Sequence, residues 1–246
     1  MSHSTMMIDS DPGGQSASPD ILQAMRTTPL LGDLADSVLD RLVAISRIVN
    51  VPEDVQLCRQ GDAADQLFIV LSGYLSAFSI APNGTFAVVE VIRSGETLGL
   101  LSVLARQPRV LGLRAVTASS LLSVDGGELM VLIQQEPSLF NALIRLGVNE
   151  FRALVRQVCD LKLRTTAQRL GCYLLSLSAG QQTNTAALRL PFDKRLLAAR
   201  LGCRQENLSR AFAALRDYGV ETHGARVILH DVARLTAYSE PDEAFA

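Results

Sequence analysis

The chain has 246 residues, of which 48% are hydrophobic, 20% are charged and 5% are aromatic. This apolar content excludes a disordered chain, and the length is typical of two domains of ordinary size. The formal net charge is only −2, but residues 164–235 contain 11 Lys and Arg against 5 Asp and Glu. Residues 1–163 contain 12 basic residues against 17 acidic ones. A basic C-terminal part joined to an acidic N-terminal part predicts that one end alone binds a polyanion.

The four cysteines, Cys58, Cys159, Cys172 and Cys203, are far apart and form no CxxC pair. Their spacing predicts neither a metal site nor a disulfide framework, and it is typical of reduced thiols in a cytoplasmic protein. No apolar run reaches 18 residues, so no contact with a membrane is expected. Residues 1–19 contain acids, Gly and Pro where a signal peptide needs an apolar core, and they are predicted to form a disordered leader.

A helical segment is predicted from about residue 20 to residue 49, with interruptions at Pro29 and Gly32, because apolar residues recur there every three or four positions. Between residues 51 and 131 the pattern changes to short apolar runs at 67–71, 75–80, 86–92, 110–116 and 121–124. Turn signals separate these runs, including Asn83-Gly84 and Asp125-Gly126-Gly127. Many short strands at this spacing predict a sandwich or small barrel, with a hairpin at Asn83-Gly84.

A long helix is predicted over residues 138–164, where apolar residues recur at helical spacing. At about 1.5 Å per residue it spans roughly 40 Å, longer than one small domain needs, so we expect it to pair with a second copy of itself. The alternative is a core helix that lies across the strands. The predicted apolar stripe consists of Leu143, Phe151, Leu154, Val158 and Leu161.

Residues 190–230 predict a winged helix-turn-helix. Asp193 is expected to cap a short helix, Gly202 to end it, and residues 205–218 to form a second helix. A hairpin wing follows over residues 219–229, with its tip at His223-Gly224-Ala225. The apolar stripe of the second helix consists of Leu208, Ala211, Phe212 and Leu215.

Polar residues at the start of the second helix are candidates for reading base edges in the major groove of DNA. These residues are Arg204, Gln205, Glu206, Ser209 and Arg210. Lys194 and Arg226 are candidates for contacts with the phosphates on either side. The alternative is a small helical domain with a solvated, charged face.

The segment Gly202-Cys203-Arg204-Gln205-Glu206-Asn207-Leu208-Ser209-Arg210 resembles the recognition segment of the CRP/FNR family of bacterial transcription regulators. Residues 59–73 and 95–99 resemble the opening and the effector-binding part of that family's cyclic-nucleotide-binding-like roll. The resemblance implies an α+β protein with a β-roll (jelly roll), a long dimerisation helix and a winged helix-turn-helix. It also implies that a homodimer binds palindromic double-stranded DNA of the type TTGAT-N4-ATCAA, with RNA polymerase as a further partner.

On this basis we expect five parts. They are a leader (1–19), a β-roll sensor domain with N-terminal helices (20–137), a dimerisation helix (138–164), a DNA-binding domain (165–238) and an acidic tail (239–246).

The resemblance places Glu96, Arg109, Leu154 and Val155 at effector-binding positions. Glu96 and Arg109 suit a cyclic nucleotide, but Val110 stands where the family has Ser, and Leu154 and Val155 stand where it has hydroxyl residues. Each polar ligand atom left unpaired in a buried site costs about 1–3 kcal/mol, so we expect no binding of cyclic AMP. Arg109 and Arg114 are then expected to lie at the surface or in ion pairs.

Other cofactors are constrained by residue counts. Only Cys58 and Cys159 lie within residues 1–163, which is too few for an iron–sulfur cluster. The three histidines are His3, His223 and His230, so the roll has no His to bind haem. Haem with a different protein ligand, or a roll without any ligand, is left open.

Cys203 is a redox candidate, because it precedes a helix and adjoins Arg204, and both favour a thiolate. The alternative is a small residue that fills the core. The chain contains no GxSxG, HExxH or P-loop motif, so we do not expect an enzyme. A dimeric ligand-binding or scaffold protein that does not bind DNA is the alternative function.

Overall fold

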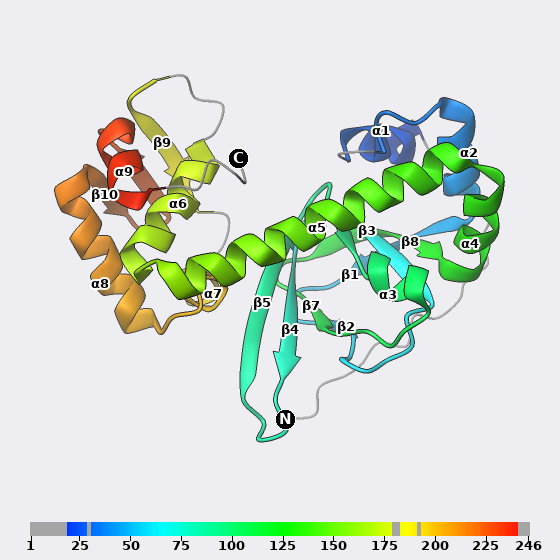
Figure 1. Cartoon of the computed structure of the whole chain (residues 1–246), viewed down its shortest axis with the longest axis horizontal. Helices are drawn as coiled ribbons and strands as arrows, with labels where there is room; N and C mark the ends of the chain where they lie inside the picture. The colour runs from blue at the N-terminus through cyan, green and yellow to red at the C-terminus, as the bar shows by residue number, and fades with distance from the viewer. Residues whose placement is uncertain (1–18, 29–30, 179–182, 191–192, 241–246) are drawn as a thin grey trace. The chain divides into compact units, whose positions relative to one another are not determined.

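The computed structural model describes residues 19–28, 31–178, 183–190 and 193–240 (Figure 1). The predicted leader, except for Pro19, and the tail beyond Glu240 lie outside these residues. Contacts divide the chain after Glu150 into two compact units, called here the roll unit and the C-terminal unit. None of the described helices has the length and apolar character needed to cross a membrane.

The N-terminal segment contains two short helices, α1 (Pro19–Thr27) and α2 (Asp36–Ala44), and the predicted interruption at Gly32 lies between them. The prediction of helix up to residue 49 is wrong, because Ser46–Val51 is strand β1. β1 pairs with a later strand over six residues, and Val49 and Val51 are buried at alternate positions. Pairing with a distant strand therefore overrides the helical spacing of the local sequence.

Two antiparallel four-stranded sheets form the roll, in the orders β1-β8-β3-β6 and β2-β7-β4-β5. This arrangement confirms the predicted β-roll. The strands after β1 are β2 (Gln56–Cys58), β3 (Gln66–Ser72), β4 (Tyr74–Ile80), β5 (Phe86–Arg93), β6 (Thr97–Leu98), β7 (Gly112–Ala115) and β8 (Ser119–Asp125).

Strand β3 is apolar from Leu67 to Leu71 because it contributes to two cores. Leu67 and Ile69 belong to a cluster shared with the helices, including α2 and the start of α5. Phe68 and Val70 belong to a second cluster, which lies between the two sheets. Side chains alternate across a strand, so a strand covered on both faces needs apolar residues at every position.

The turn signals have two different outcomes. Asn83-Gly84 joins β4 to β5 as predicted, and Gly84 adopts a left-handed φ of 81°. Asp125-Gly126-Gly127 is not a simple turn, because it begins helix α4 (Gly126–Gln135). The Asp125 carboxylate accepts a hydrogen bond from the Glu128 backbone N–H, so it caps the helix instead of closing a hairpin. A further short helix, α3 (Leu100–Ala105), follows β6.

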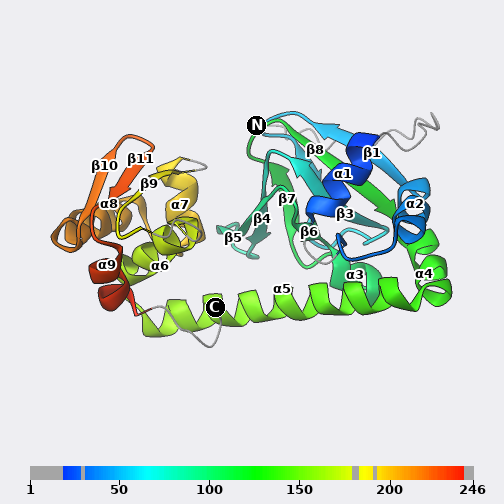
Figure 2. The same ribbon diagram turned by 90° about the horizontal axis from the view of Figure 1, so that it is seen from above.

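Helix α5 (Pro137–Leu163) is a single unbroken helix of 27 residues, as the view in Figure 2 shows. The predicted stripe is wrong at Leu143, which is 1% exposed and packs in the roll core. Leu143 lies next to the exposed stripe and faces the roll. The other four predicted members are exposed, and Phe140, Ile144 and Val148 are exposed with them.

The C-terminal unit contains a helix-turn-helix and a three-stranded sheet of order β10-β11-β9. The second helix of the motif ends at Leu215, and a 3₁₀ turn (Arg216–Tyr218) completes the predicted span. Strand β9 and helix α9 are not identified from the sequence. The elements are α6 (Thr166–Ser178), β9 (Ala186–Arg189), α7 (Lys194–Arg200), α8 (Gln205–Leu215), β10 (Val220–His223), β11 (Arg226–Leu229) and α9 (Val232–Ser239).

Candidate DNA-binding surface and ligand cavity

Local sequence signals position the two helices of the motif. The Asp193 carboxylate accepts a hydrogen bond of 2.7 Å from the Leu196 backbone N–H and so caps α7. Gly202 has a left-handed φ of 62° and ends that helix, because glycine alone adopts this conformation without strain. Four residues of α8 then pack into the core of the unit: Leu208, Ala211, Phe212 and Leu215.

Burial of this apolar stripe leaves the opposite face of α8 in solvent. All five predicted base-reading residues lie in the stretch 204–210 and are exposed: Arg204, Gln205, Glu206, Ser209 and Arg210. Ser209 Oγ also donates a hydrogen bond of 3.1 Å to the Gln205 carbonyl. The structure thus presents three long charged side chains and two polar ones on the N-cap and about the first two turns of α8.

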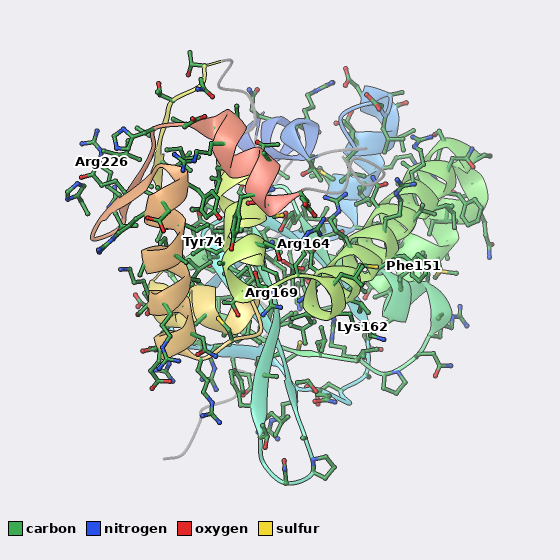
Figure 3. All side chains as sticks on the ribbon, turned by 60° about the vertical axis from the view of Figure 1, so that its left-hand side comes forward. Tyr74, Phe151, Lys162, Arg164, Arg169 and Arg226 are labelled. Carbon is green, nitrogen blue, oxygen red and sulfur yellow. The ribbon has the colours of Figure 1, made fainter. Side chains whose placement is uncertain are left out.

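The two predicted phosphate contacts lie on different elements. Lys194, at the start of α7, is exposed, and its Nζ lies 5.2 Å from the centroid of the Phe212 ring. This cation–π contact joins the first residue of α7 to the Phe212 ring of α8. Arg226 is exposed at the outer end of the wing, as Figure 3 shows.

The wing contains a cluster of ionisable side chains that sequence reasoning missed. The Glu221 carboxylate contacts His223 Nε2 and His230 Nε2, each at 2.8 Å. These hydrogen bonds, that of His230 first, lower the pKa of Glu221. Glu221 and His223 are two residues apart on β10, so their side chains lie on the same face of the strand, and this spacing could have predicted their contact. His230 follows β11, the strand that pairs with β10, and no local spacing indicates its contact with Glu221.

A cavity of about 140 Å³ lies in the roll unit, bordered by β6, α3, β7 and α5. Its wall combines apolar residues with two ionisable side chains, Arg109 and Glu150. Arg109 is 7% exposed, so the expectation that it lies at the surface or in an ion pair is wrong. Its Nη2 donates to the Gln66 carbonyl at 2.6 Å, and its guanidinium lies over the Phe68 ring at 5.0 Å.

Arg114, the other arginine expected at the surface, is partly buried. Its guanidinium lies 5.7 Å from the centroid of the Phe78 ring, and its Nε is buried without a hydrogen-bond partner. Among the residues that the structure describes, this aromatic contact and not an ion pair holds the Arg114 side chain.

Glu150 was not predicted, and it takes the place in the cavity that Glu96 was expected to take. Its Oε1 accepts a hydrogen bond of 2.8 Å from Thr97 Oγ1. Burial raises the pKa of Glu150, and the nearby Glu96 carboxylate acts in the same direction. Glu96 itself pairs with Arg93 at 3.0 Å and does not line the cavity.

The other two predicted effector contacts are also absent from the cavity wall. Leu154 is 45% exposed and Val155 is partly buried, and both lie beyond Glu150 on α5. Val110, which stands where a hydroxyl residue was expected, does line the cavity.

Cys203 packs against the core of the C-terminal unit and is partly buried. Burial raises the pKa of its thiol, although Arg169 acts in the opposite direction. The expectation of a favoured thiolate is therefore wrong, and Cys203 fits the alternative of a residue that fills the core. Burial likewise raises the pKa of the Cys58 thiol to about 11.

Two family models match this chain. Residues 48–136 match the cyclic nucleotide-binding domain, and residues 168–238 match the Crp-like helix-turn-helix domain. Together with the roll and the exposed face of α8, these matches define a DNA-binding transcription regulator with a sensor domain of the cyclic-nucleotide-binding type. The chain belongs to the CRP/FNR family.

Similar proteins agree with this assignment. The CRP-like cAMP-activated global transcriptional regulator of Mycobacterium tuberculosis is 25% identical over 191 residues, which cover 76% of this chain and 85% of that protein. The transcriptional activator protein Anr of Pseudomonas protegens is 27% identical over 214 residues, covering 85% and 86%. Both relatives are regulators of transcription.

Solved structures show the same fold. FixK2 from Bradyrhizobium japonicum has a TM-score of 0.69 at 19% identity and covers 78% of this chain and 96% of its own. The c-di-GMP responsive regulator CLP from Xanthomonas campestris has a TM-score of 0.63 at 24% identity, covering 80% and 99%.

Proposed function

We propose that this regulator acts as a homodimer in the cytoplasm and binds palindromic DNA of the type TTGAT-N4-ATCAA through α8. The observation that carries the proposal is the exposed face from Arg204 to Arg210, held over a fully buried apolar stripe. The Arg side chains of this face can donate to guanine O6 and N7, and the Glu side chain can accept from cytosine N4. The Ser hydroxyl can contact a base as a donor or as an acceptor. RNA polymerase is the expected partner at the promoter.

The exposed residues of α5 support a dimer. Ile144, Phe151 and Val158 recur every seven residues, and each is 45% exposed or more. Phe140, Leu154 and Leu161 occupy the complementary heptad position and are 44–46% exposed. β-branched and Leu residues at these two positions favour a two-stranded coiled coil. A second copy of α5 is therefore the partner that buries this stripe.

We further propose that the cavity does not bind cyclic AMP. The apolar Val110 side chain forms part of its wall, and Glu150 adds a carboxyl group that repels a phosphate when ionised. Of the described residues that line the cavity, none is His, Cys, Met or Tyr, the side chains that ligate haem iron. Freshly purified protein should therefore show no Soret band, and calorimetry should show no micromolar affinity for cyclic AMP.

Fluorescence anisotropy with labelled duplexes tests the DNA-binding function. A TTGAT-N4-ATCAA duplex should bind at least about a thousandfold tighter than a scrambled duplex of the same composition at physiological salt. Equal and weak binding of both duplexes by a protein that remains dimeric would favour the ligand-binding or scaffold alternative.

A further inference from the structure

Among the described residues, no acid forms an ion pair with Arg109, the buried cation of the cavity in the roll unit. The Arg109 guanidinium donates to the Gln66 carbonyl, lies over the Phe68 ring and acts electrostatically on the Cys58 thiol. A guanidinium has five N–H donors, so most of its donors remain available. A buried charge without a counter-ion is costly, and an anionic group in the cavity would relieve that cost.

Space is left for such a group. Gly99 lies against the guanidinium, and a Cβ atom at this position would meet Arg109 Nη1 at 2.5 Å. Gly99 also has a left-handed φ of 80°, so both the backbone conformation and the lack of space for a side chain favour glycine at this position. The absence of a side chain at residue 99 keeps one edge of the guanidinium clear within the cavity.

The same cavity contains the Glu150 carboxyl group, which forms no ion pair with Arg109 or any other cation among the described residues. Glu150 accepts a hydrogen bond from Thr97, and the nearby charge of Glu96 has the same sign. A positively charged group of a ligand would stabilise the ionised carboxylate.

The remainder of the wall is mostly apolar and limits the size of a ligand. Leu98, Val110, Leu111 and Leu113 line it together with Ala77. At roughly 10–15 Å³ for each water-sized group, 140 Å³ holds a ligand of about ten non-hydrogen atoms. This volume suits a small molecule with an aliphatic part.

We propose that the cavity binds a small amino acid, whose carboxylate pairs with Arg109 and whose ammonium group pairs with Glu150. The inference rests on the proposed role of the roll as a sensor, and it names the class of signal. Both charges of the ligand would replace missing partners, and its aliphatic carbons would contact the leucines and Val110. A simple carboxylic acid or a simple amine satisfies only one of the two protein groups.

Isothermal titration calorimetry of the full-length protein tests the binding of amino acids to the cavity. Two amino acids are used, which differ in the separation between the ammonium group and the carboxylate. L-leucine is compared with 4-methylpentanoate and 3-methylbutylamine, and 5-aminopentanoate with pentanoate and pentylamine. At least one of the two amino acids should bind roughly tenfold or more tightly than both of its single-charge analogues. No binding of either amino acid at 10 mM, or equal binding of an amino acid and its carboxylic acid, would overturn the proposal.

The Glu150→Gln variant provides the matched control, because it keeps the size of the side chain and a partner for Thr97. It should lose the preference for the amino acid over the carboxylic acid while still binding the acid. Arg109→Lys should weaken the binding of both the amino acid and the carboxylic acid. A Glu150→Gln protein that retains the full preference would also overturn the proposal. Anisotropy with the palindromic duplex is measured on the same preparations, so a failed sensor ligand is distinguished from failed DNA binding.

Discussion

Glu150 places a carboxyl group where a carboxylate is poorly solvated and lies close to another acid. Its pKa is raised above the usual 4.5, so the folded protein holds this proton more tightly than the unfolded chain does. By linkage, the stabilisation from this proton is fully present below pH 4.5 and is lost as the pH rises through the folded-state pKa. The free energy of unfolding is thus lowered at neutral pH by this one residue.

Glu150→Gln should therefore be more stable than the wild type at pH 7, and the difference should shrink as the pH falls toward 4.5. The amide keeps the hydrogen bond with Thr97 and carries no charge at either pH. Urea denaturation of both proteins across this pH range measures the difference. Glu53→Gln, which changes an exposed acid, serves as the control. A constant difference between Glu150→Gln and wild type would contradict the raised pKa.

The sequence predicted the exposed polar face of α8 far better than the residues that line the cavity. Arg204 to Arg210 are adjacent in the chain, so the turn before them and the stripe beneath them are both local signals. Thr97 and Glu150 are 53 residues apart, and only the packing of α5 against the roll brings their side chains together. The error at Arg109 has the same origin, because its burial depends on Gln66 and Phe68 of β3.

At the scale of elements, helix α5 has one face buried against the roll and one face exposed to solvent. Leu139, Ala142, Leu143 and Leu146 are buried in the roll core, whereas the heptad stripe from Phe140 to Leu161 is exposed. Spacing alone predicted an apolar helix but assigned Leu143 to the wrong face. The distinction depends on which residues the roll covers, and that is a tertiary property.

Leu154→Glu should weaken dimerisation. Near the two-fold axis of a coiled coil, two glutamates would face each other in an otherwise apolar seam. Sedimentation velocity over a range of concentrations measures the change, and the midpoint of association should rise by at least about tenfold. Leu163→Glu is the matched control, because Leu163 is 80% exposed and lies outside both heptad positions. If Leu154→Glu and Leu163→Glu sedimented alike as dimers, α5 would not form the interface.

Helices α6 and α9 approach closely at a glycine. A Cβ atom on Gly171 would overlap Ser239 Oγ and lie 3.1 Å from Ser239 Cβ. Ser239 is fully buried, and its hydroxyl has no hydrogen-bond partner among the described residues. This contact docks α9, the element that the sequence did not reveal, onto the helix-turn-helix unit.

Gly171→Ala should destabilise the protein by about 1–3 kcal/mol, because the added methyl group forces the two helices apart. Ser239→Ala alone should be neutral or slightly stabilising, since it removes an unpaired buried hydroxyl. In the double variant, Ser239→Ala should recover part of the loss. Chemical denaturation of the four proteins gives the coupling, and strictly additive effects would show that the two residues do not meet.

For the whole molecule, the division of charge matches the division of structure. The basic excess lies in the C-terminal unit, where α7, α8 and the wing carry exposed cations. Acidic residues outnumber basic ones in residues 1–163, which include the roll unit. The net charge of −2 for the whole chain does not reveal this arrangement. Binding to DNA should then depend on salt through the C-terminal unit alone.

Lys194→Ala should weaken binding to palindromic and scrambled DNA by similar factors. Loss of one phosphate contact per monomer should lower the slope of log K against log salt by about one unit per monomer. Anisotropy titrations at four salt concentrations give this slope. Lys162→Ala, on the exposed part of α5, should leave it unchanged. A reduced slope in Lys162→Ala but not in Lys194→Ala would move the phosphate contact away from α7.

The selectivity of Arg210→Ala is the most direct measurement of base reading by α8, because Arg210 is the residue of α8 that we assign to guanine. Anisotropy compares wild type and variant on the TTGAT-N4-ATCAA duplex, on a duplex with the guanines replaced, and on scrambled DNA. We expect Arg210→Ala to lose roughly 1–3 kcal/mol of binding free energy per half-site on the first duplex only, so that the variant no longer distinguishes it from the guanine-replaced duplex. An Arg210→Ala protein that binds the palindrome as tightly and selectively as wild type would show that α8 does not read the DNA.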